Sequence, residues 1–342
     1  MDLLERTSGK KTNKKAVFLG SLLCAVILLA VALLAQKKMS SKFSPLHVEG
    51  TQLVNEKGEP VQLKGLSTHG LQWFPQYVNP DFFKQMHDEW HMNAVRLAMY
   101  TAEDGYIDGD RDAFKKLVED GVNYAEEAGL YAIIDWHVNK DSDPRRYMEE
   151  SKDFFAYMSE KFADKDHVLY EICNEPNGAA GWDVITEYAN EVIPVIRANA
   201  PDAVILVGTP GYSKLILAPS YAPLQFDNVM YTLHFYAATN KDSIRKDMKD
   251  ALEKGVPVFI SEFGVSRGGG SGEIDTVEGG KWLDACDELG VSYMMWSVAN
   301  KNETSAFLKV TTENVSGFTD DQLSDGGLWY VKRMRGDAAD EN

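Results

Sequence analysis

Short apolar runs recur along the chain between residues 62 and 296, and stretches with helical spacing separate them. Each run holds five or six residues, a usual length for a strand that is buried on both faces. The runs cover residues 62–66, 94–99, 131–136, 168–173, 203–207, 229–233, 256–260 and 292–296. Helical spacing is clearest at residues 112–128, 182–198 and 243–254, where Asp112, Asp183 and Ser243 suit a helix start. Eight strands that alternate with helices predict an α/β fold, a (β/α)8 TIM barrel over residues 47–335.

The segment before the barrel predicts a short N-terminal β-hairpin. Residues 47–61 alternate around Asn55-Glu56-Lys57-Gly58, a turn signal that places the hairpin turn at residues 55–58. A doubly wound open sheet is the alternative to the barrel, and it should carry a Gly-rich turn after its first strand. No such turn follows Leu66, so the sequence favours the barrel.

The N-terminal region differs from the rest of the chain. Residues 16–35 are uncharged and apolar, and twenty such residues just span a bilayer as a helix. Lysines in the basic leader, residues 1–15, favour a signal-anchor whose N-terminus is cytoplasmic. A cleaved signal peptide is the alternative, but it needs a small residue at the −3 position, where Leu33 stands.

Both interpretations export the barrel. An anchor embedded in the lipid bilayer would hold it at the extracellular face of the cell membrane, with residues 36–46 as a tether. A cleaved leader would release it as a secreted protein. Residues 336–342 form an acidic tail at the other end of the chain.

Charge and cysteine content limit the partners. The formal net charge is −17, and the first 46 residues carry a net of +6, which leaves about −23 on the remainder. Such an acidic body repels phosphate backbones, which argues against a nucleic-acid partner. The three cysteines imply no disulfide framework. We expect a monomer.

Polar and aromatic residues collect where seven of the eight predicted strands end. Because the carboxyl ends of parallel barrel strands meet at one face, we expect these side chains around a common mouth. Glu175 follows the fourth strand in the stretch LYEICNEP, and Glu262 follows the seventh in SEFG. The other strand-end residues are His69, Trp73, Arg96, Tyr100, Asp135, His137, Asn174, His234, Tyr236 and Trp296.

Two acids at strand ends across a barrel mouth suit the cleavage of a glycosidic bond. One carboxyl group protonates the leaving oxygen, and the second attacks the anomeric carbon or activates a water. Taken alone, either Glu175 or Glu262 would also fit a solvated or ion-paired loop acid. Strand alternation places Glu171 and Cys173 on the face of Glu175, and we expect Glu171 to be a buried, hydrogen-bonded partner.

The motifs at the strand ends resemble those of glycoside hydrolase family 5. The stretches STHGLQWF, NAVRLAMY, IIDWHV, LYEICNEP, LHFY, SEFG and MMWSVANK follow the order of its bacterial endo-β-1,4-glucanases, or cellulases. The resemblance covers nearly all of residues 47–335. It implies a retaining endo-glycosidase that cuts internal β-1,4 bonds of β-glucan by double displacement, with Glu175 as acid/base and Glu262 as nucleophile. It also implies supporting roles for Arg96, His137, Asn174, His234, Tyr236 and Trp296.

Each implied role has a physical reason. Arg96 is a permanent cation that favours an ionised Glu262, and Tyr236 can donate a hydrogen bond to the same carboxylate. The charge on Glu262 should raise the pKa of Glu175, so that Glu175 begins as an acid. Asn174 can hold a sugar 2-hydroxyl, and Trp296 offers a pyranose ring an apolar face, although its ring would also plug the barrel top. Flanking subsites would be lined by His69, Trp73, Tyr100, Trp182, Lys301 and Glu303.

Three alternatives remain at this point. His69, His137 and His234 could together bind zinc, but they lie on separate strands without a closely spaced His pair, so we expect no metal and no other cofactor. A mannanase or a xyloglucanase could use the same scaffold. A non-catalytic polysaccharide-binding protein is the alternative from another class, although such a protein has no need of both glutamates.

Overall fold

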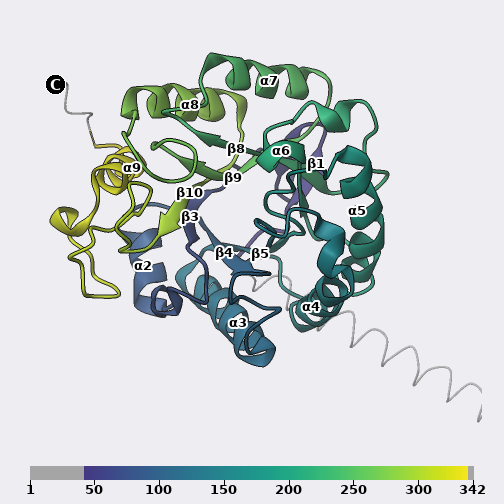
Figure 1. Ribbon diagram of the computed structural model, residues 1–342, viewed down its shortest axis with the longest axis horizontal. Coiled ribbons are helices and arrows are strands. Elements are labelled where there is room, and N and C mark those ends of the chain that lie inside the picture. Colours follow the sequence, from purple (N-terminus) through teal and green to yellow (C-terminus); the bar gives the residue numbers. More distant parts are fainter. Residues whose placement is uncertain (1–41, 338–342) are drawn as a thin grey trace, which may run out of the picture. The chain divides into compact units, whose positions relative to one another are not determined.

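Eight parallel strands close into a barrel at the centre of the protein in the computed structural model, which describes residues 42–337 (Figure 1). The strands pair in chain order, and the last one pairs with the first. They are β3 (Lys64–Thr68), β4 (Ala94–Tyr100), β5 (Tyr131–His137), β6 (Val168–Glu171), β7 (Ile205–Gly208), β8 (Val229–Tyr236), β9 (Val258–Gly264) and β10 (Tyr293–Val298). The predicted TIM barrel is confirmed.

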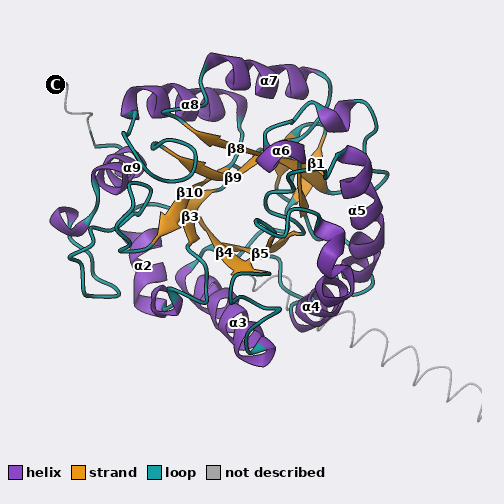
Figure 2. Cartoon of the chain, in the orientation of Figure 1, coloured by secondary structure: helices purple, strands orange, loops and turns teal. Residues whose placement is uncertain are grey.

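Helices surround the strands on the outside of the barrel (Figure 2). They are α2 (Pro80–Asp88), α3 (Arg111–Ala128), α4 (Met148–Lys161), α5 (Trp182–Arg197), α7 (Asp242–Glu253), α8 (Thr276–Leu289) and α9 (Asp325–Arg335). The four-residue element α6 (Pro210–Ser213) lies inside this ring, and its residues Gly211 and Tyr212 have left-handed φ values. Short 3-10 turns are η1 (Pro75–Tyr77), η2 (Pro144–Tyr147), η3 (Ala218–Ser220) and η4 (Asp320–Gln322). The expected start of α3 at Asp112 was wrong: the Asp110 carboxylate accepts hydrogen bonds from the backbone N–H groups of Asp112 and Ala113, and so caps the helix.

The N-terminal segment reverses direction twice, and the predicted turn at residues 55–58 is one of the two reversals. Strands β1 (His47–Glu49) and β2 (Gln52–Val54) pair antiparallel, so the chain reverses at Gly50 and Thr51. Gly50 has a φ of 61°, a conformation that glycine adopts at little cost. Residues 55–58 form the second reversal: Val54 pairs antiparallel with Pro60 across it, and the Val61 N–H donates to the Leu53 carbonyl at 2.8 Å. Leu46 and Leu53 then pack with side chains from the amino ends of the barrel strands and cover that end of the barrel.

Side chains inside the barrel form an apolar lower layer and a polar upper layer. Ala94, Ile133, Leu169 and Met230 belong to the apolar layer. Two residues further along each strand, the inward positions are Arg96, Asp135, Glu171 and Thr232, and all four are fully buried. The polar layer thus lies directly below the carboxyl ends of the strands.

Several sequence predictions concern residues outside the described range. The apolar segment 16–35, the basic leader, most of the tether and most of the acidic tail lie there. Within residues 42–337, no helix has both the length and the hydrophobicity needed to cross a membrane.

Candidate active site

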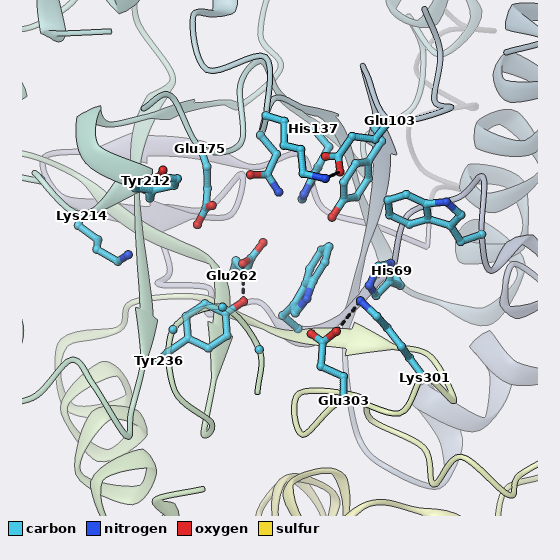
Figure 3. Close-up of a pocket in the computed structure, with 18 residues that line it drawn as sticks. His69, Glu103, His137, Glu175, Tyr212, Lys214, Tyr236, Glu262, Lys301 and Glu303 are labelled. Atoms are coloured by element: carbon cyan, nitrogen blue, oxygen red, sulfur yellow. Dashed lines mark hydrogen bonds and ion pairs between the residues drawn. The ribbon is translucent and has the colours of Figure 1, made fainter. Parts of the chain in front are cut away.

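Glu175 and Glu262 meet at the carboxyl end of the barrel (Figure 3). A carboxylate oxygen of each residue and a ring nitrogen of His234 all lie within 4.8 Å of one another. Carboxyl groups about 5 Å apart can flank one glycosidic bond, with the second one acting as nucleophile. The pair therefore has the spacing that the sequence interpretation requires.

Glu175 lies in a loop held against the neighbouring strand. Strand β6 ends at Glu171, earlier than expected, and Cys173 packs with Tyr170 and Ile172 in the core between barrel and helices. The expectation that Cys173 shares a face with Glu175 was therefore wrong, because strand alternation stops where strand pairing stops. The Glu175 N–H donates to the Val138 carbonyl at 3.0 Å, which fixes the loop beyond the end of β6.

An extra residue in β9 aims Glu262 into the barrel. Thr232 pairs with Phe259 and His234 pairs with Glu262, so two steps along β8 match three steps along β9. This bulge lets the consecutive residues Ser261 and Glu262 both contribute to the polar interior. Ser261 bonds Glu171 and His234 below, while Glu262 reaches the cavity above.

Arg96 lies at the centre of the polar layer, and Glu262 is not its main partner. Its shortest contacts are Nε to Glu171 Oε2 at 2.7 Å and Nη2 to Asn174 Oδ1 at 2.6 Å. Asp135 is 3.0 Å away, and Glu262 Oε2 is 3.5 Å from Nη1. Arg96 thus helps Glu262 stay ionised, as expected, but chiefly neutralises the carboxylates below it.

Contacts of Arg96 also determine the orientation of Asn174 and of the His137 ring. Because a guanidinium only donates, the oxygen of Asn174 faces Arg96 and its NH2 group faces His137 Nε2 at 3.2 Å. His137 Nε2 is then an acceptor, and Nδ1–H donates to Asp135 Oδ2 at 2.6 Å. Burial lowers the pKa of His137, so this ring is neutral.

A second hydrogen-bond chain runs from Arg96 to Glu175. Glu171, paired with Arg96, accepts from the Ser261 hydroxyl at 2.7 Å. The only proton of the Ser261 hydroxyl is engaged in this bond, so Ser261 Oγ can only accept from His234. His234 Nε2–H therefore donates to Ser261 Oγ at 2.9 Å. Burial lowers the pKa of His234 to about 4, so its Nδ1 carries no proton near neutral pH. Nδ1 lies 3.0 Å from Glu175 Oε1, so the proton in that contact belongs to Glu175.

The two glutamates divide one proton between them. Burial raises the pKa of Glu175 to about 7. The pKa of Glu262 is also raised to about 7, mainly by burial and to a smaller extent by the charge of Glu175. Burial, rather than the expected charge on Glu262, is thus the main cause at Glu175. Tyr236 donates to Glu262 Oε1 at 2.7 Å and favours its ionised form. Glu262 therefore holds the charge, and Glu175 holds the proton.

A cavity of about 560 Å³ opens above the pair. Trp296 lines it although only 6% exposed, and its indole stacks on the His137 ring at 5.1 Å. Figure 3 shows His69, Lys301 and Glu303 on one side of the two glutamates, and Tyr212 and Lys214 on the other. The lining residues are His69, Trp73, Tyr100, Glu103, His137, Asn139, Lys140, Glu175, Tyr212, Lys214, Tyr236, Glu262, Gly268, Gly269, Gly270, Trp296, Lys301 and Glu303.

Comparison with known proteins identifies the family. Residues 54–302 match the model of Cellulase (glycosyl hydrolase family 5). The chain belongs to glycosyl hydrolase family 5. Endoglucanase A of Butyrivibrio fibrisolvens is 42% identical over 297 residues, which are 85% of this chain and 69% of that protein. An endoglucanase of Clostridium saccharobutylicum is 39% identical over 326 residues, 92% of this chain and 72% of the relative.

Solved structures agree with this assignment. The catalytic domain of Thermobifida fusca endoglucanase Cel5A (E5) E355Q, in complex with cellotetraose, superposes with a TM-score of 0.82 at 34% identity. The match covers 85% of this chain and 97% of that domain. The cellulase Cel5C_n gives a TM-score of 0.80 at 39% identity over 85% of this chain and 91% of that one. The protein is a glycoside hydrolase.

Most predicted substrate-contact residues line the cavity of this family 5 hydrolase, but Trp182 does not. The Trp182 indole packs against Tyr231 and donates to the Ala222 carbonyl at 2.8 Å, at the start of α5. Arg96, Asn174 and His234 lie beneath the cavity and do not line it. Asn174 and His234 contact the lining residues His137 and Glu175, and the Asn174 NH2 group already bonds His137 and the Val138 carbonyl.

Several residues of the cavity wall carry no signal in the sequence. Lys140 pairs with Glu103 at 2.5 Å, and both come from loops that carry no motif. Tyr212 and Lys214 follow the fifth strand, the one strand end where the sequence offered no candidate. The glycines at 268–270 also form part of the wall; a Cβ on Gly270 would lie 2.0 Å from the Glu303 carboxylate.

Two carboxylates and an imidazole this close could in principle ligate a cation. Both nitrogens of His234, however, already bond protein groups, Ser261 and Glu175. A metal would have to break the contact that holds the Glu175 proton. The donor set therefore fits acid/base chemistry better than metal ligation.

Proposed function

We propose that this family 5 hydrolase cuts internal β-1,4-glucosidic bonds of cellulose or a related β-glucan, with retention of configuration. The observation that carries the proposal is the separation of the nearest carboxylate oxygens of Glu175 and Glu262, which is at most 4.8 Å. That distance leaves no room for a water between the second carboxylate and the sugar, so Glu262 is the nucleophile. The names of the relatives support β-glucan as the substrate and internal cleavage as the mode.

In the first step, Glu262 attacks the anomeric carbon while Glu175 gives its proton to the leaving oxygen. Tyr236 holds one oxygen of Glu262 and aims the other at the sugar. Trp296 supports the sugar that becomes bonded to the enzyme. The leaving chain departs past Glu175.

In the second step, Glu175 takes a proton from water, which attacks the glycosyl-enzyme. Formation of the ester has removed the charge of Glu262, so Glu175 can remain ionised until it acts as base. The bare Nδ1 of His234 faces the Glu175 carboxylate and favours its return to the acid form. The cycle then restores the resting proton distribution.

Two measurements test this mechanism. Proton NMR of cellopentaose hydrolysis should show the β-anomer as first product, and α-anomer first would refute retention. The variant Glu262→Gln should lose turnover by at least about 1,000-fold while still binding cellotetraose in calorimetry. Full activity in that variant would refute the nucleophile assignment.

Sugar preference is tested with a panel of substrates. Carboxymethylcellulose should be hydrolysed in preference to mannan, xylan and xyloglucan, with a spread of product lengths early in the reaction. Rapid cleavage of mannan or xyloglucan would instead identify a mannanase or xyloglucanase. Binding without any cleavage would identify a polysaccharide-binding protein.

We also propose that the enzyme acts outside the cell, anchored in the bilayer through residues 16–35. The uncharged apolar segment behind a basic leader supports this proposal. Membrane fractionation with N-terminal sequencing tests it, because an anchored chain keeps its leader. A soluble mature chain that begins near Gln36 would show cleavage and secretion instead.

A further inference from the structure

Lys214 differs from the other two lysines that line the cavity. Lys140 pairs with Glu103, and Lys301 pairs with Glu303. Among the residues that the structure describes, Lys214 has no carboxylate within 4.0 Å; its ammonium lies 5.3 Å from the centre of the Tyr212 ring. In Figure 3, its side chain extends toward Glu175 and Glu262. A cation without a carboxylate partner thus faces the catalytic pair.

The turn that carries Lys214 is built against the loop that carries Glu175. The Tyr212 N–H donates to the Pro176 carbonyl at 3.0 Å, and the Ser213 hydroxyl donates to the Asn174 carbonyl at 2.6 Å. The residues on both sides of Glu175 are therefore held by this one turn. Ser213 is fully buried, and its hydroxyl also accepts from Thr232 at 3.0 Å.

The backbone of the same turn adopts an unusual conformation. Gly211, Tyr212 and Ser213 have φ values of 69°, 64° and 51°, so three consecutive residues are left-handed. For Tyr212 and Ser213, which carry a Cβ, this conformation is unfavourable. The hydrogen bonds to Pro176 and Asn174 hold the turn in this conformation, which fixes the position of Lys214 relative to Glu175.

Lys214 lies at the leaving-group end of the cavity. We place the retained part of the substrate on the side of Trp296 and His69, whose rings lie 5.2 Å apart. The leaving chain must extend the other way, past Glu175 toward Tyr212 and Lys214. This is where Glu175 gains a negative charge as it releases its proton.

We propose that Lys214 is a positioning residue of the hydrolytic reaction, whose ammonium stabilises the carboxylate that forms on Glu175 as the leaving sugar is protonated. The inference rests on the proposed role of Glu175 as acid/base. A positive charge placed before the reaction, where negative charge develops, lowers the barrier without reorganisation. Since Lys214 is half-buried, solvent screens it in part, and its effect is smaller than that of a buried cation.

Other groups around Glu175 do not replace this function. Arg96 is already surrounded by Asp135, Glu171 and Glu262, whereas no carboxylate of residues 42–337 lies within 4.0 Å of the Lys214 ammonium. The positive charge of Lys214 accordingly lowers the pKa of Glu175, which burial raises. The charged and titratable groups that face Glu175, besides Lys214, are Arg96 and Tyr100 of β4, Asp135 of β5, Glu171 of β6, His234 and Tyr236 of β8, and Glu262 of β9.

The test compares leaving groups in the variants Lys214→Met and Lys214→Arg. Cellopentaose needs protonation of its leaving oxygen, whereas 2,4-dinitrophenyl β-cellobioside does not. We expect Lys214→Met to lower kcat/KM on cellopentaose about 5-fold and to change it less than about 2-fold on the aryl glycoside. In the pH profile of kcat/KM on cellopentaose, the basic limb should shift to higher pH by about 0.5 unit, because the loss of Lys214 raises the pKa of Glu175. Lys214→Arg should retain most activity.

The control is Lys249→Met, which removes one exposed positive charge from helix α7, away from the cavity. It should leave both substrates and the pH profile unchanged. An equal loss on both substrates in Lys214→Met, or an unmoved basic limb, would overturn the inference, as would unaltered kinetics. A wild-type enzyme without activity on either substrate would instead refute the proposed function.

Discussion

The Nδ1 atom of His234 lies 3.0 Å from Oε1 of Glu175, and the other ring nitrogen of His234 is committed to the Ser261 hydroxyl at 2.9 Å. Since Ser261 gives its own proton to Glu171, the His234 ring is held as the Nε2–H tautomer. The ring then offers Glu175 a lone pair and no proton. This contact favours the protonated acid.

Removal of the Ser261 hydroxyl should reverse this preference. In Ser261→Ala, His234 can carry its proton on Nδ1 and donate it to the Glu175 carboxylate, which lowers the pKa of Glu175. We expect the basic limb of the pH profile of kcat/KM to shift to lower pH by about 0.5–1 unit. Nitrogen-15 NMR of the His234 ring should show the change of tautomer directly.

The matched control for that variant is Ser159→Ala, which removes a fully buried hydroxyl from helix α4. Its pH profile and the His234 spectrum should be those of the wild type. If Ser261→Ala keeps the Nε2–H tautomer and its basic limb, Ser261 does not determine the protonation of His234.

Loss of Arg96 should destabilise the whole barrel. Its guanidinium is fully buried and lies near three carboxylates, so Arg96→Met leaves buried negative charge without compensation. We expect the free energy of unfolding at pH 7 to fall by about 3–5 kcal/mol in urea denaturation. Arg111→Met, which breaks an exposed pair with Glu150 at 3.7 Å, should change it by less than about 1 kcal/mol. Equal effects in both variants would contradict the central role of Arg96.

Glu175→Gln should stabilise the protein in a pH-dependent way. The pKa of Glu175 rises from 4.5 to about 7 on folding, so its proton stabilises the folded state below pH 4.5, and this contribution is lost as the pH rises through 7. Glutamine stays neutral throughout. We expect little difference at pH 4.5 and a gain of the order of 1 kcal/mol, or roughly 2 °C in Tm, at pH 8.

Differential scanning calorimetry at both pH values measures this effect, with Glu253→Gln on the exposed surface of α7 as control. A gain in Tm that is the same at pH 4.5 and pH 8 would show that the charge of Glu175 does not destabilise the fold.

Chelation should not affect the enzyme. Both nitrogens of His234 bond protein groups, and Glu175 and Glu262 are engaged with His234 and Tyr236. After dialysis against EDTA, kcat on cellopentaose should be unchanged within experimental error. Activity that falls on chelation and returns with one divalent cation would instead identify a metal-dependent reaction.

Strand periodicity and strand-end residues made the barrel and its acid pair predictable from sequence. The eight apolar runs correspond to β3 through β10, because strands buried on both faces are continuous hydrophobic segments. Glu175 and Glu262 were identifiable because every strand of a barrel ends at the same face. The turn predicted at residues 55–58 is present, whereas the reversal at Gly50 was missed because a single glycine gives a weak turn signal.

The sequence by itself thus determined the architecture and the chemical groups at its mouth, since both follow from local pattern. Only the tertiary structure decided the bulge that turns Ser261 and Glu262 inward together, the separate place of Trp182, and the approach of Lys214 to Glu175. It also decided which contacts keep the proton on Glu175. Proton positions depend on burial and on donor and acceptor atoms from strands far apart in the chain, and a linear pattern does not contain those distances.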